Sequence, residues 1–323
     1  MRKPPSHWVG DGFHVYPVFE NKAFTAAISP FLMFDYGAPR VFPPTKKQLG
    51  VGQHPHRGFE TVTIAFQGEV EHSDSLGNRG VIGPGDVQWM TAARGIVHEE
   101  FHSKKMAAEG GTLEMCQLWV NLPAAAKMAQ PKYQPILAKD IPVLPLFCPD
   151  DVAGAGAGAG AGAEATVSSD GDAADIQSET GQEGAGGPSA ASTVSTVRVI
   201  TGSYRGQAGA AATHTPMDVW DVDLGTTEKT YQLETPEGHN TLIFVRRGAV
   251  EIMGQTLSLA DLAILSLDGT LTNIRAREKH TKILVLSGLP IDEPIAARGP
   301  FVMNTQLELQ QAMSDYQQGR NGF

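Results

Sequence analysis

The sequence has few of the features that mark secreted, membrane-bound or nucleic-acid-binding proteins. Its two cysteines, Cys116 and Cys148, lie far apart and fit no metal-binding spacing, so we expect free thiols in a reducing compartment. No apolar run approaches the roughly 18 residues of a membrane span, and the N-terminal residues lack the apolar core of a signal peptide. These absences indicate a cytoplasmic protein, or a nuclear one in a eukaryote, with no membrane partner.

Positive charge is also in short supply. The chain has 25 Lys and Arg against 35 Asp and Glu, which gives a net charge of −10. An acidic balance of this size argues against a large nucleic-acid-binding surface, because such surfaces are basic. We therefore expect no direct nucleic-acid partner.

The sequence is rich in short β-strand patterns separated by turns. TVTIAF and VQWMT are typical strands, and GNRG and GPGD are typical turns, so an all-β fold of small barrels or jelly rolls is expected. The 323 residues give room for two domains. GEVE at 68–71 is echoed by GAVE at 248–251, which predicts two barrels of similar plan.

Two segments depart from the β-pattern. Residues 149–193 begin with repeated Ala-Gly pairs and continue with small and acidic residues, a composition that predicts a flexible insertion. Near the end, TQLELQQAMSDYQQG predicts a helix, because Thr305 and Glu308 form a capping-box pattern and Gly319 is a natural stop. Its apolar stripe is expected to pack on a barrel.

Two pairs of polar residues indicate a metal site. His54 and His56 lie in HPHRGFETVT, and His98 and Glu100 lie in RGIVHEE, each pair two residues apart. Residues i and i+2 share a face of a strand, so neighbouring strands would aim three imidazoles and one carboxylate at one point. These ligands suit a divalent transition metal with positions left open for water or substrate.

The order of these residues resembles the double motif of the cupins, with HxH, Glu60, PGD and then a single His. The strings HPHRGFETVT, GPGDVQWMTA and RGIVHEE are similar to the pirin family of bicupins, as are PFLMFDYG, LWVNLP and EPIAARGPFVMNT. The resemblance covers nearly the whole chain apart from the insertion. It implies two tandem cupin domains, which are jelly-roll β-barrels: a metal-binding barrel at 1–146, a barrel without metal at 194–300, and a C-terminal helix and tail at 301–323.

The resemblance also implies the ligands and the metal. The pirin ligands match His54, His56, His98 and Glu100, and the metal is expected to be Fe(II), although Mn, Co, Ni, Cu or Zn would suit the same ligands. Glu60 matches the fourth ligand of many other cupins and is expected to orient a ligand imidazole or to satisfy backbone donors. Gly58 permits a bend between them.

Other residues are placed by parity and neighbourhood. Glu99 should point away from the metal, and His72 and His102 are expected on the surface. Aromatic and apolar walls could come from Phe59, Trp89 and Met90. The remaining histidines of the second barrel are scattered and are expected to be surface or core residues; they are His214, His239 and His280.

Two classes of function follow from the resemblance. Several pirins are similar to quercetin 2,3-dioxygenases, which implies a flavonol-type aromatic substrate, dioxygen, and Glu100 as the base that accepts the substrate proton. The alternative is a non-enzymatic, redox-sensitive transcriptional co-regulator with a metal site and a protein partner, because animal pirins resemble such co-regulators. A sugar isomerase on the same barrel fits the pirin-type strings less well. We expect a monomer.

Overall fold

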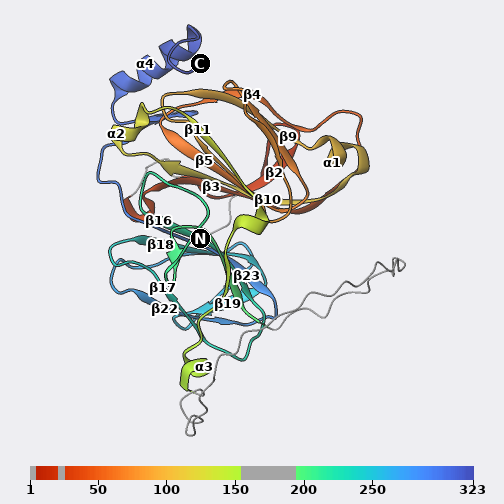
Figure 1. Ribbon diagram of the computed structural model, residues 1–323, viewed down its shortest axis with the longest axis vertical. Coiled ribbons are helices and arrows are strands. Elements are labelled where there is room, and N and C mark those ends of the chain that lie inside the picture. The colour runs from red at the N-terminus through yellow and green to blue at the C-terminus, as the bar shows by residue number, and fades with distance from the viewer. Residues whose placement is uncertain (1–4, 21–25, 154–193) are drawn as a thin grey trace, which may run out of the picture.

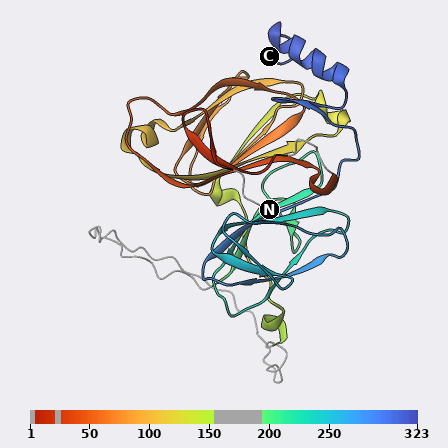
Figure 2. The ribbon, with the colours of Figure 1, turned by 180° about the vertical axis from the view of Figure 1, so that it is seen from behind.

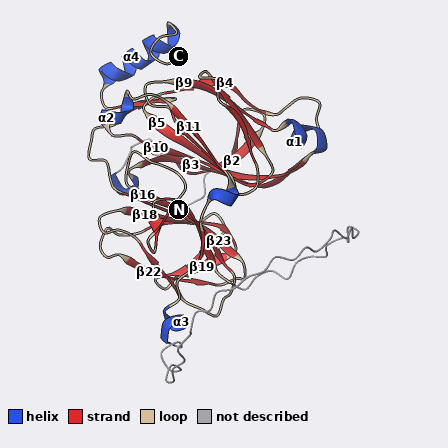
Figure 3. Cartoon of the chain, viewed as in Figure 1, coloured by secondary structure: helices blue, strands red, loops and turns tan. Residues whose placement is uncertain are grey.

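The computed structural model describes residues 5–20, 26–153 and 194–323, and these form two β-barrels stacked along the long axis of the molecule (Figure 1). Strands dominate both barrels, and the few helices lie at their edges (Figure 3). The all-β fold of two cupin barrels with a short C-terminal helix is confirmed. Within the segment predicted as an insertion, 149–153 form helix α3 (Pro149–Ala153) and 154–193 lie outside the described residues.

The first barrel is built from a seven-stranded and a four-stranded antiparallel sheet. The strands of the larger sheet, in spatial order, are β1 (His7–Val9), β2 (Phe13–Glu20), β3 (Phe31–Phe42), β10 (Gly111–Asn121), β5 (Phe59–Gln67), β8 (Val87–Thr91) and β11 (Lys132–Ile136). The smaller sheet contains β4 (Gly50–His56), β9 (Ile96–His102), β6 (Val70–Asp74) and β7 (Arg79–Ile82). The short helices of the first barrel are η1 (Ala26–Ile28), α1 (Lys104–Glu109), α2 (Ala124–Lys127) and η2 (Ala138–Asp140).

The second barrel repeats this plan with a six-stranded and a four-stranded sheet. The larger sheet runs β12 (Val143–Pro145), β13 (Thr196–Thr201), β16 (Met217–Leu224), β23 (Thr281–Gly288), β18 (Asn240–Arg247) and β21 (Leu262–Ile264). The smaller sheet runs β17 (Tyr231–Glu234), β22 (Leu271–Ala276), β19 (Ala249–Ile252) and β20 (Gln255–Ser258). A hairpin of β14 (Ser203–Tyr204) and β15 (Gln207–Ala208) accompanies them.

The barrels meet through the larger sheet of each (Figure 2). On β5, Val62 and Ile64 point out of the first barrel and pack in one apolar cluster with Val219 and Leu242 of the second. The intervening residues of β5 point inward, so this strand is buried on both faces, as its unbroken TVTIAF run requires. Cys116 and Cys148 are both buried free thiols, as predicted.

After the second barrel the chain returns to the first. Strands β24 (Ala296–Arg298) and β25 (Phe301–Met303) precede helix α4 (Gln306–Gln317), which lies at the far end of the first barrel (Figure 1). The predicted capping box is present, with Thr305 and Glu308 each satisfying a backbone N–H of the other. Leu309 and Ala312 pack on the β24–β25 hairpin. No helix among the described residues is long and apolar enough to cross a membrane.

Candidate metal centre

Neighbouring strands of the smaller sheet bring three histidines together. His54 on β4 is paired directly with His98 on β9, and His56 lies two residues further along β4. The ring centroids of His54 and His98 are 4.3 Å apart, and those of His56 and His98 are 4.9 Å apart. One nitrogen from each ring falls within 4.8 Å of the others, so the group could hold a metal ion.

The nitrogens of this group are suited to a metal. His56 Nδ1 and His98 Nε2 are buried and have no hydrogen-bond partner among the described residues, which costs free energy unless something binds them. His54 Nδ1 lies 2.8 Å from the carbonyl oxygen of Gly52, which leaves Nε2 to ligate. Burial lowers the pKa of His56 and of His98 well below 6.5, so both rings are neutral, as ligation requires.

His98 is followed by a chain of polar contacts to His72 and Asp74, which both lie on β6. His72 Nδ1 lies 3.4 Å from His98 Nδ1 and 3.2 Å from Gln88 Nε2, and His72 Nε2 lies 3.1 Å from a carboxylate oxygen of Asp74. If the His72 Nε2–H donates to Asp74, the single lone pair of its Nδ1 can accept from the Nδ1–H of His98, while Gln88 Nε2 donates to Glu100. That tautomer leaves the Nε2 lone pair of His98 free for a metal.

The expectation that His72 and His102 lie on the surface is wrong. Both side chains are buried, because β6 and β9 each turn every second residue into the barrel. His72 stacks on Tyr133 with ring centroids 4.6 Å apart. His102 has a structural role at the far end of β9, where its Nε2 lies 2.8 Å from the Gly12 carbonyl oxygen. The parity of Val70, His72 and Asp74 was the sequence signal that pointed inward.

Glu100 shares the inward face of β9 with His98, and three side chains donate hydrogen bonds to its carboxylate. Oε1 accepts from Thr63 Oγ1 at 3.1 Å and from Gln88 Nε2 at 3.0 Å. Oε2 accepts from Gln117 Nε2 at 3.1 Å. An ionised carboxylate oxygen has about two acceptor positions, so Oε2 retains one and Oε1 retains none. Glu99 points away from the histidines and accepts from Ser73, as predicted.

Glu60 does not orient a ligand imidazole, contrary to the sequence expectation. It shares the outward face of β5 with Val62, toward the second barrel, and its carboxylate accepts from Thr91 at 2.7 Å. Trp89 points the same way and joins the cluster between the barrels, so it does not line the histidine site. The left-handed backbone of Gly58, with φ of +88°, lies between His56 and β5.

Aromatic rings contact the group of three histidines. The ring centroid of His56 lies 5.1 Å from that of Phe59 and 5.3 Å from that of Trp119. Phe59 was predicted as a wall, whereas Trp119 was not, although it shares the parity of Gln117 on β10. Met90 packs instead with Ile96. Gln117 also faces the site, because its side chain donates to Glu100.

The residue after His56 is clamped by the C-terminal segment. The Arg57 side chain is 1% exposed, donates to Asp315 on α4 at 2.8 Å, and lies over the ring of Phe323. Its backbone N–H donates to the carbonyl of Pro300, and its own carbonyl accepts from the N–H of Val302.

Lys127 contacts the same region from a buried position, where it donates to the carbonyls of Gly58 and Val302. Burial lowers the pKa of Lys127 to about 7. The end of β4 is thus held by residues far away in the sequence.

Comparisons with known proteins agree with this arrangement. The Pirin family profile matches residues 12–120, and the profile of the pirin C-terminal cupin domain matches 219–322. A Pseudomonas aeruginosa protein named "Putative quercetin 2,3-dioxygenase" is 44% identical over 314 residues, which cover 97% of this chain and 94% of that protein. Two barrels with a histidine group in the first define a bicupin. This chain belongs to the pirin family of bicupins.

Solved structures show the same fold. The crystal structure of a quercetin 2,3-dioxygenase from Acinetobacter baumannii is 45% identical, covers 98% of this chain and 94% of its own, and has a TM-score of 0.81. A bacterial pirin from Escherichia coli in complex with nickel(II) is 19% identical, with a TM-score of 0.55 over 88% of this chain and 95% of its own. At that identity the likeness to the nickel complex concerns the fold alone.

Proposed function

We propose that this chain is a metal-dependent dioxygenase of flavonol-type substrates, similar to quercetin 2,3-dioxygenases. The observation that carries the proposal is the group of three histidines, two of which have a buried nitrogen without a hydrogen-bond partner among the described residues. Glu100 lines the same small cavity as His54. The names of the similar proteins from Pseudomonas and Acinetobacter support it. The proposed ligands are His54, His56, His98 and Glu100, with Fe(II) as the metal and other divalent transition metals as substitutes.

Glu100 is the residue proposed to act as both ligand and base. Its Oε2 atom has one acceptor position left, which can meet either a metal or a substrate proton. Gln88 and Thr63 hold Oε1, so the carboxylate can turn only slightly about a fixed oxygen. Glu100 and His54 line the same small cavity.

The space beside the histidines sets a condition on the substrate. A cavity of about 30 Å³ is lined by His54, Glu100 and Gln117 together with Val9 and Phe13, so it has room for one or two water molecules. A flavonol is much larger. Its binding therefore requires side chains that line this cavity to move aside, so that the 3-hydroxyl and its neighbouring carbonyl reach the site.

The chemistry divides between the metal and the protein. When bound, a metal supplies Lewis acidity and a template that brings dioxygen and substrate together. The Glu100 carboxylate would accept the proton of the 3-hydroxyl at Oε2 on the one acceptor position that it otherwise offers to the metal, while Gln117 stays hydrogen-bonded to the same oxygen. The Phe59 and Trp119 rings keep His56 in place and exclude water from its inner side.

Replacing Glu100 with Gln tests the role of the carboxylate. Gln keeps the size and one oxygen but cannot accept the substrate proton, so turnover should fall by about a hundredfold or more, while metal content falls much less. Iron content and quercetin-dependent oxygen uptake are measured side by side. Glu99→Gln is the matched control, because Glu99 precedes Glu100 yet points away, and it should behave as wild type.

The same measurements decide between the classes of function. Absence of oxygen uptake by iron-loaded wild type across several flavonols contradicts the dioxygenase and favours the co-regulator. Equal uptake by wild type and Glu100→Gln keeps the enzyme but removes Glu100 as its base.

A further inference from the structure

A cavity of about 650 Å³ lies between the two barrels, within the range of small-molecule sites. It shares no lining residue with the cavity beside the histidines. The first barrel contributes Phe66 and Glu114, and the second contributes a set of basic side chains from its larger sheet. Nothing in the proposed dioxygenase chemistry uses this space.

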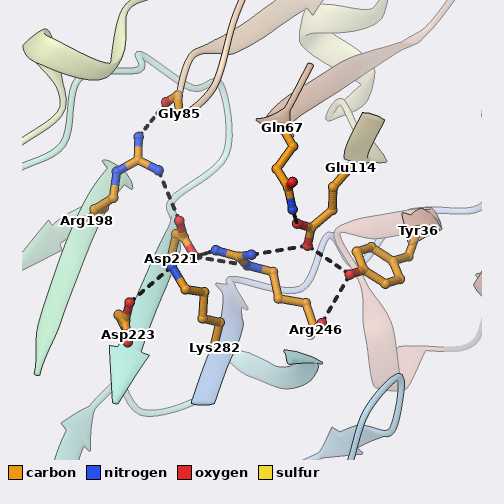
Figure 4. Close-up of polar contacts among 9 residues, drawn as sticks. All are labelled: Tyr36, Gln67, Gly85, Glu114, Arg198, Asp221, Asp223, Arg246 and Lys282. Atoms are coloured by element: carbon orange, nitrogen blue, oxygen red, sulfur yellow. Dashed lines mark hydrogen bonds and ion pairs between the residues drawn. The ribbon is translucent and has the colours of Figure 1, made fainter. Parts of the chain in front are cut away.

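Most charges around the cavity neutralise one another, some within the second barrel and one pair across the two barrels (Figure 4). Asp221 accepts from Arg246 at 3.0 Å and from Arg198 at 3.0 Å. Glu114 of the first barrel accepts from Arg246 at 3.2 Å and from Tyr36 at 2.9 Å. The Asp221 pKa is lowered: burial opposes this, but Arg246 and Arg198 outweigh it, so the carboxylate is charged.

The balance of charge leaves one cation over. Four cationic side chains line the cavity, namely Arg198, Arg246, Arg247 and Lys282. Against them stand Glu114 and Asp221 in the lining and Asp223, which pairs with Lys282 at 3.1 Å. The Arg247 side chain is exposed and makes no hydrogen bond or ion pair with any residue that the structure describes. A single negative charge would complete the set.

A β-bulge in β18 determines the position of Arg247, the cation without a partner. The register of β18 against β23 shifts between Val245 and Arg247, so Arg247 lies directly opposite Lys282. Like charges opposite each other on neighbouring strands are destabilising, by up to about 1 kcal/mol. The shift also brings the consecutive residues Arg246 and Arg247 into the same cavity lining. An anion between Arg247 and Lys282 would relieve their repulsion.

The rest of the wall is apolar and partly aromatic. Phe66 lies with its ring centroid 3.9 Å from the guanidinium carbon of Arg246, and Pro39, Pro84 and Leu259 extend the apolar surface. A flat hydrocarbon body would contact these residues, whereas a small inorganic anion would leave them exposed to water.

We propose that this cavity, the inter-barrel cavity, binds an aromatic monocarboxylate. The carboxylate lies between Arg247 and Lys282, and the ring lies against Phe66 and Leu259. Arg guanidinium groups bind carboxylates in a bidentate geometry, which suits the unpaired Arg247. The site is separate from the metal centre, so it does not depend on the dioxygenase being correct.

The probe is 2-naphthoate, titrated into metal-loaded full-length protein by calorimetry. Saturable binding to wild type is expected, and Arg247→Gln should weaken it by about tenfold or more, because a charge-assisted hydrogen bond is lost. Arg79→Gln is the matched control, since Arg79 is also exposed but lies on β7 of the first barrel, outside the cavity lining. It should bind as wild type does. The neutral 2-naphthylmethanol should bind much more weakly.

Each alternative outcome contradicts the proposal in a recognisable way. Equal weakening by Arg79→Gln would mean general charge attraction. Loss of naphthoate binding in His56→Ala would place the ligand at the metal centre. Inorganic phosphate binding as tightly as naphthoate would show that the apolar wall contributes nothing. Absence of saturable binding to wild type would remove the site altogether.

Discussion

Replacing Glu60 with Gln should stabilise the protein at alkaline pH and change little under acid conditions. The Glu60 side chain is fully buried, and Thr91 donates a hydrogen bond to one of its oxygens while the other has no hydrogen-bond partner among the described residues. Burial raises the pKa of this carboxyl from 4.5 to about 7. Between these values the unfolded chain loses the proton while the folded protein keeps it, so stability falls as pH rises.

The size of the effect follows from the same pKa change. Raising a pKa from 4.5 to about 7 corresponds to about 3 kcal/mol lost above pH 7. Gln stays neutral at every pH and keeps an oxygen that can accept from Thr91. The difference in unfolding free energy between variant and wild type should therefore be small near pH 4.5 and grow to about 3 kcal/mol at about pH 8.

Urea unfolding of wild type and Glu60→Gln over this pH range measures the difference. Subtracting wild type removes the contributions of His56 and His98, whose lowered pKa values make stability rise with pH through about 6.5. Glu237→Gln, at an exposed position, is the matched control and should unfold much as wild type does, as surface substitutions usually do. A flat difference for Glu60→Gln as well, or destabilisation at high pH, would refute the assignment of a protonated, buried Glu60.

Two further predictions concern the metal centre. His56→Ala should lose most of the bound metal measured in purified protein, because it removes one of the proposed ligands, whereas His239→Ala in the second barrel should keep it; full occupancy in His56→Ala would contradict the ligand assignment. Asp315→Asn should lower the free energy of unfolding by about 3–5 kcal/mol, because it leaves the buried Arg57 unpaired. Competition with a chelator should also show weaker metal binding, while Asp268→Asn, at an exposed position, should change neither.

The residues that could be predicted from sequence are those governed by the period of a strand. His54 and His56, and His98 and Glu100, share faces because side chains alternate, and this holds whatever the strands pair with. Glu60 was misplaced because it was assigned from its match to the cupin motif, whereas the left-handed backbone of Gly58 separates β4 from β5 and Glu60 faces Thr91. His72 was misplaced because a polar turn follows it, although its burial depends on β9 lying beside β6.

Contacts between distant segments were beyond sequence reasoning. The Arg57 clamp joins residues 258 positions apart, and no local pattern records such a pairing. The inter-barrel cavity depends on a bulge in β18 and on how two sheets meet, which side-chain periodicity does not describe. Local sequence patterns did predict the two barrels and the C-terminal helix, since a repeated strand pattern and a capping box can be recognised without knowing the fold.

The return of the chain to the first barrel has a consequence for the order of synthesis. A ribosome makes the protein from its N-terminus, and domains generally fold as they emerge. The first barrel can form its sheets early, but Arg57 cannot be covered until Asp315 and Phe323 have left the ribosome. Until then the strand carrying His54 and His56 ends in an uncovered arginine. We expect metal bound during synthesis to exchange freely, and metal bound after release to be retained.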